Sequence, residues 1–304
     1  MEYQTSFALI ASIADDQSNI CWPLFLTDLL LLLELVLSLA TQAMMANQVS
    51  LMSYLQHGPT ALPRQTGPSG NTRNMRYSAR DINNLGFWRA FNLNTIQQQY
   101  GILLATAQIT DELFPTSPPQ AVNSETAVRS RIDLYLTPRV RRSLRCGFAH
   151  LTQTNQLGNR SVVDYGVGTL AETIENFIPD IAYFDTLLPI GNCPNRAPGD
   201  IKPSWKWSTN MRHQPTTGEE FRQALSQVNF YMKQHHARYG YILTDRELVA
   251  IRRRDRDGNL DLSRAIPWDS RGTAQQPRLT VLLALWYLGM LAGNNGGPTG
   301  WYLD

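Results

Sequence analysis

The alternation of short strand patterns with helical patterns between residues 124 and 253 constrains the fold of this chain more than any other feature. The strand patterns are short, bounded by polar or turn residues and rich in β-branched or aromatic side chains, and they lie at residues 161–167, 177–184, 199–207, 239–245 and 247–253. Residues 219–235 instead carry Phe221, Leu225, Val228 and Met232 at spacings of four, three and four, which indicate a helix. Ser124 followed by Glu125 predicts the capped start of an earlier helix. The order helix, three strands, helix, strands predicts an α/β protein with a mixed central sheet flanked by helices.

The rest of the chain divides by composition. Residues 1–56 predict a mainly helical, hydrophobic N-terminal region, and residues 57–80, rich in Pro, Gly, Ser and Asn, predict a flexible linker. Residues 81–121 predict a helical segment that ends in a second Pro-bearing stretch. The α/β domain is then expected at residues 122–304.

Two long apolar runs must be buried in a protein core, in a membrane or against another protein. Residues 24–40 form the strongest one, but Asp28 and Glu34 interrupt it and it falls short of the ~20 clean apolar residues of a membrane span. We therefore favour a packed helix over a membrane anchor, with membrane association left open as the alternative. Residues 279–293 are apolar nearly all round and predict a buried core helix. Either apolar helix is also a candidate surface for a protein partner or a second copy.

Charge and cysteine usage narrow the class of protein. The net charge is +2, so a nucleic-acid-binding surface requires local clusters of basic residues. Cys21, Cys146 and Cys193 are far apart and show no disulfide or zinc spacing. This usage is typical of a reducing compartment, so we expect an intracellular protein in the nucleus or cytoplasm.

Two carboxylates and a lysine carry the strongest chemical signal. Asp180 follows Pro179 inside the second predicted strand, and Asp200 lies in the third, two residues before Lys202. Side chains two residues apart on a strand point to the same face, so Lys202 is expected beside Asp200. Two carboxylates on neighbouring strands can hold a hard divalent cation through oxygen. The alternative is an ordinary surface ion pair between Asp200 and Lys202.

These motifs, with Gln227 and Tyr231 on the following helix, resemble the PD-(D/E)xK nuclease superfamily, which has a restriction-endonuclease-like core. The Gln-x-x-x-Tyr spacing is similar to the RecB-like branch, and the resemblance is strongest to fungal-type proteins that carry this domain. It covers residues 122–292. The resemblance implies a Mg²⁺-dependent nuclease, with Mn²⁺ as a substitute, that cleaves DNA in preference to RNA. It also implies metal ligation by Asp180, Asp200 and the carbonyl of Ile201.

The resemblance assigns Lys202 to the phosphate or the attacking water, and Gln227 and Tyr231 to the same site. An acidic residue of the first helix completes such sites, which implies Glu125 as a ligand, with Glu172 and Glu175 as alternatives. One departure is the long loop between Asp180 and Asp200, LLPIGNCPNRAPG, which also fits a remodelled or inactive site. The competing hypothesis is therefore a catalytically inactive nuclease fold that binds nucleic acid or protein.

Clustered arginines are the candidates for phosphate contacts. They are Arg141, Arg142 and Arg145 in one set and Arg252, Arg253 and Arg254 in another, and we expect one of the sets to lie on the rim of the site. Adjacent His235 and His236 lack partner ligands nearby, so we interpret them as a solvated helix end and not as a metal site.

Overall fold

The computed structural model describes residues 29, 31–33, 35, 47–65, 67 and 70–304. The chain divides into two units, Met1–Gln48 and Val49–Asp304. In the first unit, Leu29, residues 31–33 and Leu35 are helical, and the rest of the apolar run at 24–40 lies outside the described residues. Among the residues that the structure describes, no helix combines the length and apolar character needed to cross a bilayer.

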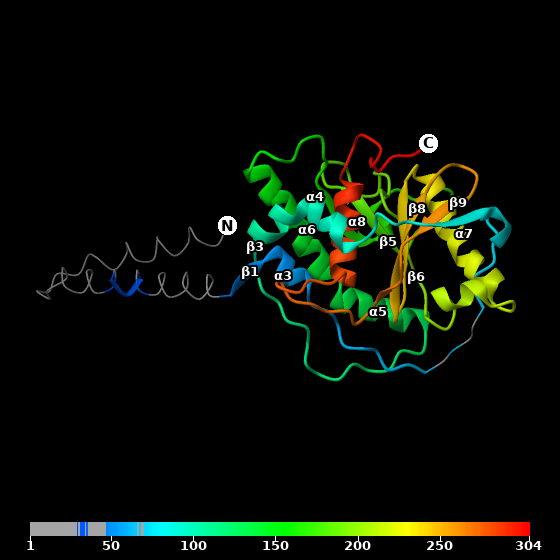
Figure 1. Ribbon diagram of the computed structural model, residues 1–304, viewed down its shortest axis with the longest axis horizontal. Helices are drawn as coiled ribbons and strands as arrows, with labels where there is room; N and C mark the ends of the chain where they lie inside the picture. Colours follow the sequence, from blue (N-terminus) through cyan, green and yellow to red (C-terminus); the bar gives the residue numbers. More distant parts are fainter. Residues whose placement is uncertain (1–28, 30, 34, 36–46, 66, 68–69) are drawn as a thin grey trace, which may run out of the picture. The chain divides into compact units, whose positions relative to one another are not determined.

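A mixed sheet forms the centre of the unit at residues 49–304 (Figure 1). Its strand order is β2-β9-β8-β7-β6-β5-β4, and β10 pairs with β8. The strands are β2 (Asn84–Phe87), β4 (Val163–Val167), β5 (Ile181–Asp185), β6 (Gly199–Ile201), β7 (Tyr239–Leu243), β8 (Glu247–Arg253), β9 (Asn259–Leu262) and β10 (Ile266–Pro267). Pairs β6·β7 and β2·β9 are parallel and the others are antiparallel, so the predicted mixed sheet flanked by helices is confirmed.

Helices cover both faces of this sheet. On one face lie α4 (Leu93–Thr106), α6 (Thr137–Gln153) and α8 (Val281–Ala292), and on the other lies α7 (Gly218–Gln234) (Figure 1). Strand β8 shows why both faces are covered: Leu248 and Ala250 belong to the core under α6 and α8, whereas Val249 and Ile251 belong to the core under α7. Alternate side chains of a strand point to opposite faces, so a strand that is apolar on both faces requires helices on both sides.

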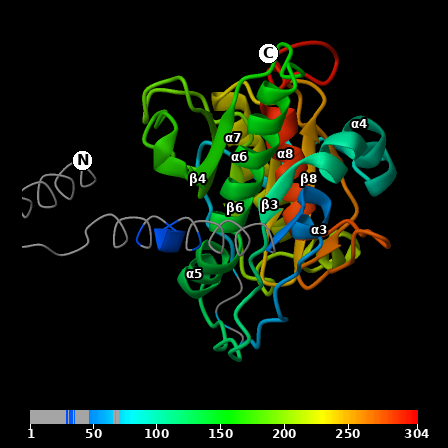
Figure 2. The same ribbon diagram turned by 90° about the vertical axis from the view of Figure 1, so that its left-hand side faces the viewer.

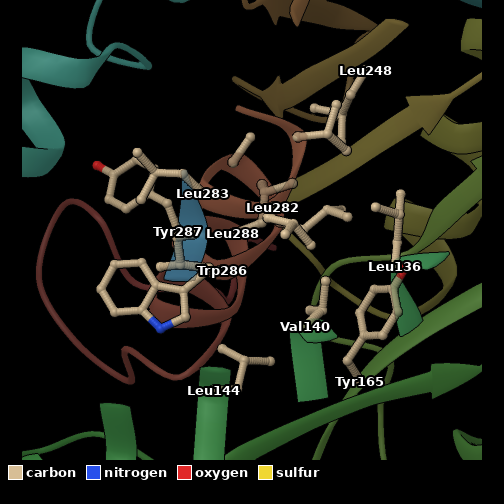
Figure 3. Packing of buried hydrophobic residues seen from close by; sticks show 14 of the residues in the cluster. Leu136, Val140, Leu144, Tyr165, Leu248, Leu282, Leu283, Trp286, Tyr287 and Leu288 are labelled. Carbon is tan, nitrogen blue, oxygen red and sulfur yellow. The ribbon is translucent and has the colours of Figure 1, made fainter. Parts of the chain in front are cut away.

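The predicted helix at residues 279–293 is confirmed as a core helix. Every residue of α8 is buried, and Leu282, Trp286 and Leu288 pack among side chains of the sheet and of α6 (Figure 3). Helices α6 and α8 lie side by side (Figure 2), and a Cβ atom on Gly289 would come within 2.4 Å of Leu144. The expectation that α8 offers a surface to a protein partner is therefore wrong, because its apolar surface is used within the core.

The other predicted elements hold with shifted ends. Helix α5 (Glu125–Tyr135) is capped by Ser124, whose hydroxyl accepts a hydrogen bond from the backbone N–H of Ala127. The third predicted strand is much shorter than its pattern, because β6 stops before Pro203, which has no N–H for a ladder. Residues 81–121 contain α4, as expected, and also β2 and β3 (Gln108–Thr110), which pairs with β1 (Gln48–Ser50).

The segment expected to be a linker lies along α7. The side-chain amide of Asn71 donates to the backbone carbonyl of Glu220 at 3.2 Å, and the N–H of Ala79 donates to the side chain of Gln223 at 3.0 Å. Tyr77 is buried and its ring lies 5.5 Å from that of Phe230. We refer to the described residues between 70 and 82, which include the short η1 helix (Ala79–Asp81), as the strap.

Candidate active site

Strand register brings Asp180 and Asp200 together. Strands β5 and β6 are antiparallel with Ile181 opposite Gly199, so the next pair outward in this register is Asp180 opposite Asp200. Directly opposed residues of an antiparallel pair share one face, with Cβ atoms about 4.5–5.5 Å apart. Consistent with this, the N–H of Ile201 donates to Oδ2 of Asp180 at 2.7 Å. The two carboxylates therefore lie together where β5 begins, on the face of the sheet covered by α7.

Asp200 is the most deeply buried charged residue of the site. Its side chain is 1% exposed, and the Nζ of Lys202 lies 2.9 Å from its Oδ2. Apart from this ammonium, that oxygen has no hydrogen-bond donor among the described residues. Burial raises the pKa of Asp200 to about 7, the ammonium of Lys202 opposes this rise, and the negative charges of Asp180 and Glu125 add to it. The surface ion pair that the sequence left open is therefore ruled out, because both partners are buried.

Lys202 keeps its proton in this environment. Burial alone lowers the pKa of its ammonium, but the charges of Asp200, Glu125 and Asp180 outweigh burial and raise the pKa above its ordinary value. An ammonium of this kind cannot accept a proton near neutral pH. Its role in chemistry is therefore that of a fixed positive charge.

Asp180 faces a second cation. Its Oδ1 lies 2.6 Å from a guanidinium nitrogen of Arg129 on α5, whose side chain is 41% exposed. Burial raises the pKa of Asp180, and the charges of Arg129 and Lys202 oppose that rise. The side chain of Ile201 is buried in the core on the opposite face, and the assignment of its carbonyl as a metal ligand stays a prediction.

Glu125 lies at the first residue of α5 and enters the same electrostatic cluster. Its carboxylate pairs with Arg129 at 3.5 Å and with Lys206 at 3.3 Å, and its charge raises the pKa of both Asp180 and Asp200. Glu175, one of the alternatives, pairs with Arg76 of the strap. Glu125 is therefore the better placed of these two glutamates to complete the site.

Helix α7 presents Gln227 and Tyr231 to the carboxylates. The Gln227 amide donates to the Tyr231 hydroxyl at 3.0 Å, so these residues act as a pair. Burial raises the pKa of Tyr231, the bond from Gln227 opposes this, and the charges of Asp200 and Asp180 raise it further. The phenol therefore stays neutral at physiological pH and keeps a proton to donate.

Tyr77 and Arg129 also belong to the site, although the sequence motifs did not predict Tyr77 there or the pairing of Arg129 with Asp180. Burial and then the charge of Asp200 raise the pKa of the Tyr77 phenol, which places this strap residue near the carboxylates. Its distance in sequence and the polar composition around it conceal this position. The i,i+4 spacing of Glu125 and Arg129 on one helix face was the available signal for Arg129.

The arginines predicted to contact phosphate are buried or paired with carboxylates of the protein. Arg253 is 1% exposed and donates to the carbonyls of Leu303 and Ala237, so its assignment to a phosphate-binding surface is wrong. The remaining predicted arginines form ion pairs with carboxylates: Arg141 and Arg145 with Asp164, Arg142 with Glu112, and Arg252 and Arg254 with Asp261. These ion pairs neutralise the positive charge with which the arginines would attract a phosphate.

The loop between β5 and β6 holds the end of β5 in place. The Asn195 amide donates to the carbonyl of Ile181 at 2.9 Å, and the N–H of Asn195 donates to Nδ1 of His235 at 3.3 Å. His235 is 2% exposed, so the solvated helix end expected for it is wrong. Burial, reinforced by the neighbouring His236, lowers the pKa of His235 to about 4.

The pKa of His235 predicts an acid-sensitive stability. The unfolded histidine binds a proton below its ordinary pKa of about 6.5, whereas the folded one does so only near pH 4. The free energy of unfolding should therefore fall by roughly 3 kcal/mol as the pH drops from 7 to 4 on account of this residue. Urea unfolding across this range should show a weaker pH dependence for His235→Gln. The control His236→Gln removes a half-exposed imidazole whose charge is the smaller cause of the lowered pKa, so it should retain most of the wild-type dependence; equal slopes for wild type and His235→Gln would contradict the prediction.

Within the described part of the chain, no group of three or more His, Cys, Asp or Glu side chains is arranged to hold a metal ion. A Mg²⁺ ion, however, is usually bound through one or two carboxylates, with waters and substrate phosphates supplying the other oxygens. Asp180 and Asp200 fit this smaller requirement, because they face one another and Oδ2 of Asp200 has the Lys202 ammonium at 2.9 Å as its partner, with no other donor among the described residues. Comparison with protein-family models, with curated proteins and with solved structures finds no match for this chain.

Proposed function

We propose that this protein is a Mg²⁺-dependent nuclease that hydrolyses phosphodiester bonds, in DNA more readily than in RNA, and that Mn²⁺ can replace Mg²⁺. The observation that carries the proposal is the pairing of Asp180 and Asp200 across β5 and β6, with the buried ammonium of Lys202 at 2.9 Å from Asp200. Burying a cation beside two carboxylates costs free energy through desolvation, so a functional role is a reason for the protein to keep this arrangement.

The connectivity of the domain supports the proposal. Helix α6 is followed by β4, β5, β6, α7, β7 and β8, which is the order helix, three strands, helix, strands expected of a restriction-endonuclease-like core. We include that core in the proposal. The loop of residues 186–198, which departs from compact members of the superfamily, is pinned by Asn195 and leaves the paired carboxylates in place.

Each residue of the site would have a separate role in the reaction. Asp180 and Asp200 would hold the ion, which when bound would neutralise phosphate charge and lower the pKa of a water. Lys202 would stabilise negative charge that develops on the phosphate, since it stays protonated. The Tyr231 hydroxyl and the Gln227 amide would orient a phosphate oxygen or a water by donating hydrogen bonds.

Arg129 would have to move away from Asp180 when the ion binds. Its side chain is long and substantially exposed, and it retains Glu125 as a second partner, so this movement requires no change in the fold. The same ion pair favours the second candidate function, an inactive nuclease fold that binds nucleic acid or protein. In that case Arg129 neutralises Asp180 permanently.

A cleavage assay tests the proposed activity. Purified full-length protein is incubated with labelled duplex DNA, single-stranded DNA and RNA while Mg²⁺ or Mn²⁺ is titrated, with EDTA as the control. We expect saturable, metal-dependent cleavage that is strongest on DNA. Because Asp200 must lose its proton to bind an ion and burial raises its pKa to about 7, activity should rise as the pH passes upward through this value. The absence of cleavage with either metal would favour the binding protein.

A further inference from the structure

A basic cavity lies between the strap and α7. It has a volume of about 710 Å³, and its lining includes Arg73, Tyr77, Arg80, Arg212, Arg222 and Gln223. Arg212 belongs to the short η3 helix (Thr209–His213), which precedes α7. Four arginines therefore face one cavity that is built from three separate stretches of the chain.

Three of these four arginines form no ion pair with a carboxylate of the described residues, so their positive charge is not neutralised there. Arg73 is paired with Glu219 at 3.2 Å and with Glu220 at 3.1 Å. In contrast, Arg212 and Arg222 donate to uncharged backbone carbonyls, those of Leu85 at 2.9 Å and Ile82 at 2.6 Å. Arg80 is exposed and has no hydrogen-bond or ion-pair partner among the described residues. The cavity therefore carries a local excess of positive charge in a protein of nearly neutral composition.

The cavity adjoins the candidate active site. Tyr77 lines the cavity and also lies near enough to Asp200 and Lys202 for their charges to act on its phenol. Gln223 lines it too, one helical turn before Gln227 on α7. A polyanion seated in the cavity would therefore continue along α7 toward the paired carboxylates.

We propose that this cavity binds the phosphodiester backbone of a nucleic-acid strand, with Arg80, Arg212 and Arg222 contacting consecutive phosphates next to the scissile one. Guanidinium groups suit this role, because they remain charged and donate in a planar fork that matches phosphate oxygens. The inference rests on the proposed nuclease function for the identity of its ligand. It replaces the arginine sets predicted from sequence, whose charges are already paired within the protein or buried.

The test measures binding separately from cleavage. The full-length protein is titrated into a fluorescein-labelled oligothymidylate in the presence of EDTA, and binding is measured by fluorescence anisotropy over a range of NaCl concentrations. We expect the triple variant Arg80→Gln/Arg212→Gln/Arg222→Gln to bind roughly 10–100-fold more weakly at low salt. The slope of log affinity against log salt concentration should also become shallower, by the amount that corresponds to about two to three fewer phosphate contacts. The matched control is Arg89→Gln/Arg145→Gln/Arg254→Gln, which removes three exposed arginines outside the cavity and should bind as the wild type does.

Arg212 and Arg222 also donate to backbone carbonyls in and near β2, so the triple variant could lose binding because it unfolds. A single variant separates the two effects. Arg80→Glu alters a side chain without a partner, and it should weaken binding by itself while the circular dichroism spectrum stays unchanged. Binding by the cavity variants equal to wild type would overturn the inference, as would equal losses in the control or binding of inorganic phosphate but no oligonucleotide. Binding through the cavity without any cleavage would refute the nuclease and leave this inference standing. Cleavage that the cavity variants leave unchanged would support the nuclease and refute this inference.

Discussion

Replacing Asp200 by alanine is expected to abolish metal binding and DNA cleavage together. Asp200 supplies the more deeply buried carboxylate of the pair, and alanine has no oxygen to take its place. Isothermal titration with Mn²⁺ and a cleavage assay on the same preparation measure both effects. Retention of either metal binding or full activity would contradict the assignment of Asp200 as a ligand.

Lys202→Met should separate the two effects that Asp200→Ala combines. Methionine preserves the buried stem of the lysine but removes its charge, so metal binding should persist while cleavage falls by roughly 10²–10³-fold. The control is Lys233→Met, which removes a lysine from the last turn of α7. Loss of metal binding in Lys202→Met would show that Lys202 serves only to hold Asp200 in place.

Replacing Arg196 by alanine should produce one of the largest losses of stability in the protein. Arg196 lies 2.6 Å from Asp185 with both side chains less than a tenth exposed, and it also bonds to Asn295. Removing one partner of a buried pair leaves an unpaired charge, which costs about 3–5 kcal/mol. Denaturant unfolding measures this free energy directly.

Arg145→Ala provides the comparison for Arg196→Ala. Arg145 is largely exposed, and its partner Asp164 keeps a second ion pair with Arg141. Exposed pairs contribute about 1 kcal/mol or less, so this variant should remain near wild-type stability. Similar losses in both variants would contradict the view that burial determines the cost.

The convergence of Asp180, Asp200 and Lys202 could be predicted from sequence because it depends on local rules. Pleating places Lys202 beside Asp200, and short strands joined in sequence tend to pair as neighbours. The helical period placed Gln227 and Tyr231 on one face in the same way. These rules act over a few residues, and the structure follows them at this site.

The position of the strap and the partners of the arginines could not be predicted in this way. Tyr77 reaches the site through contacts with α7, more than a hundred residues later, and no periodic pattern marks it. Arg253 resembles its neighbours in sequence, yet it is buried because the chain end lies beside β8 and accepts its hydrogen bonds. Strand β2 pairs with β9 across a comparable distance. Long-range pairing of this kind is decided by the packing of the whole domain.

Titration of the wild-type protein with Mn²⁺ by calorimetry tests the central claim most directly, since that claim is that Asp180 and Asp200 hold a divalent cation. The paired carboxylates predict saturable binding at neutral to basic pH that weakens as the pH falls below about 7, where Asp200 takes up a proton. The same titration of Asp200→Ala should show no binding. A wild-type protein that binds no Mn²⁺ at any pH at which it is folded would contradict the claim and identify the Arg129–Asp180 ion pair as the permanent state of the site.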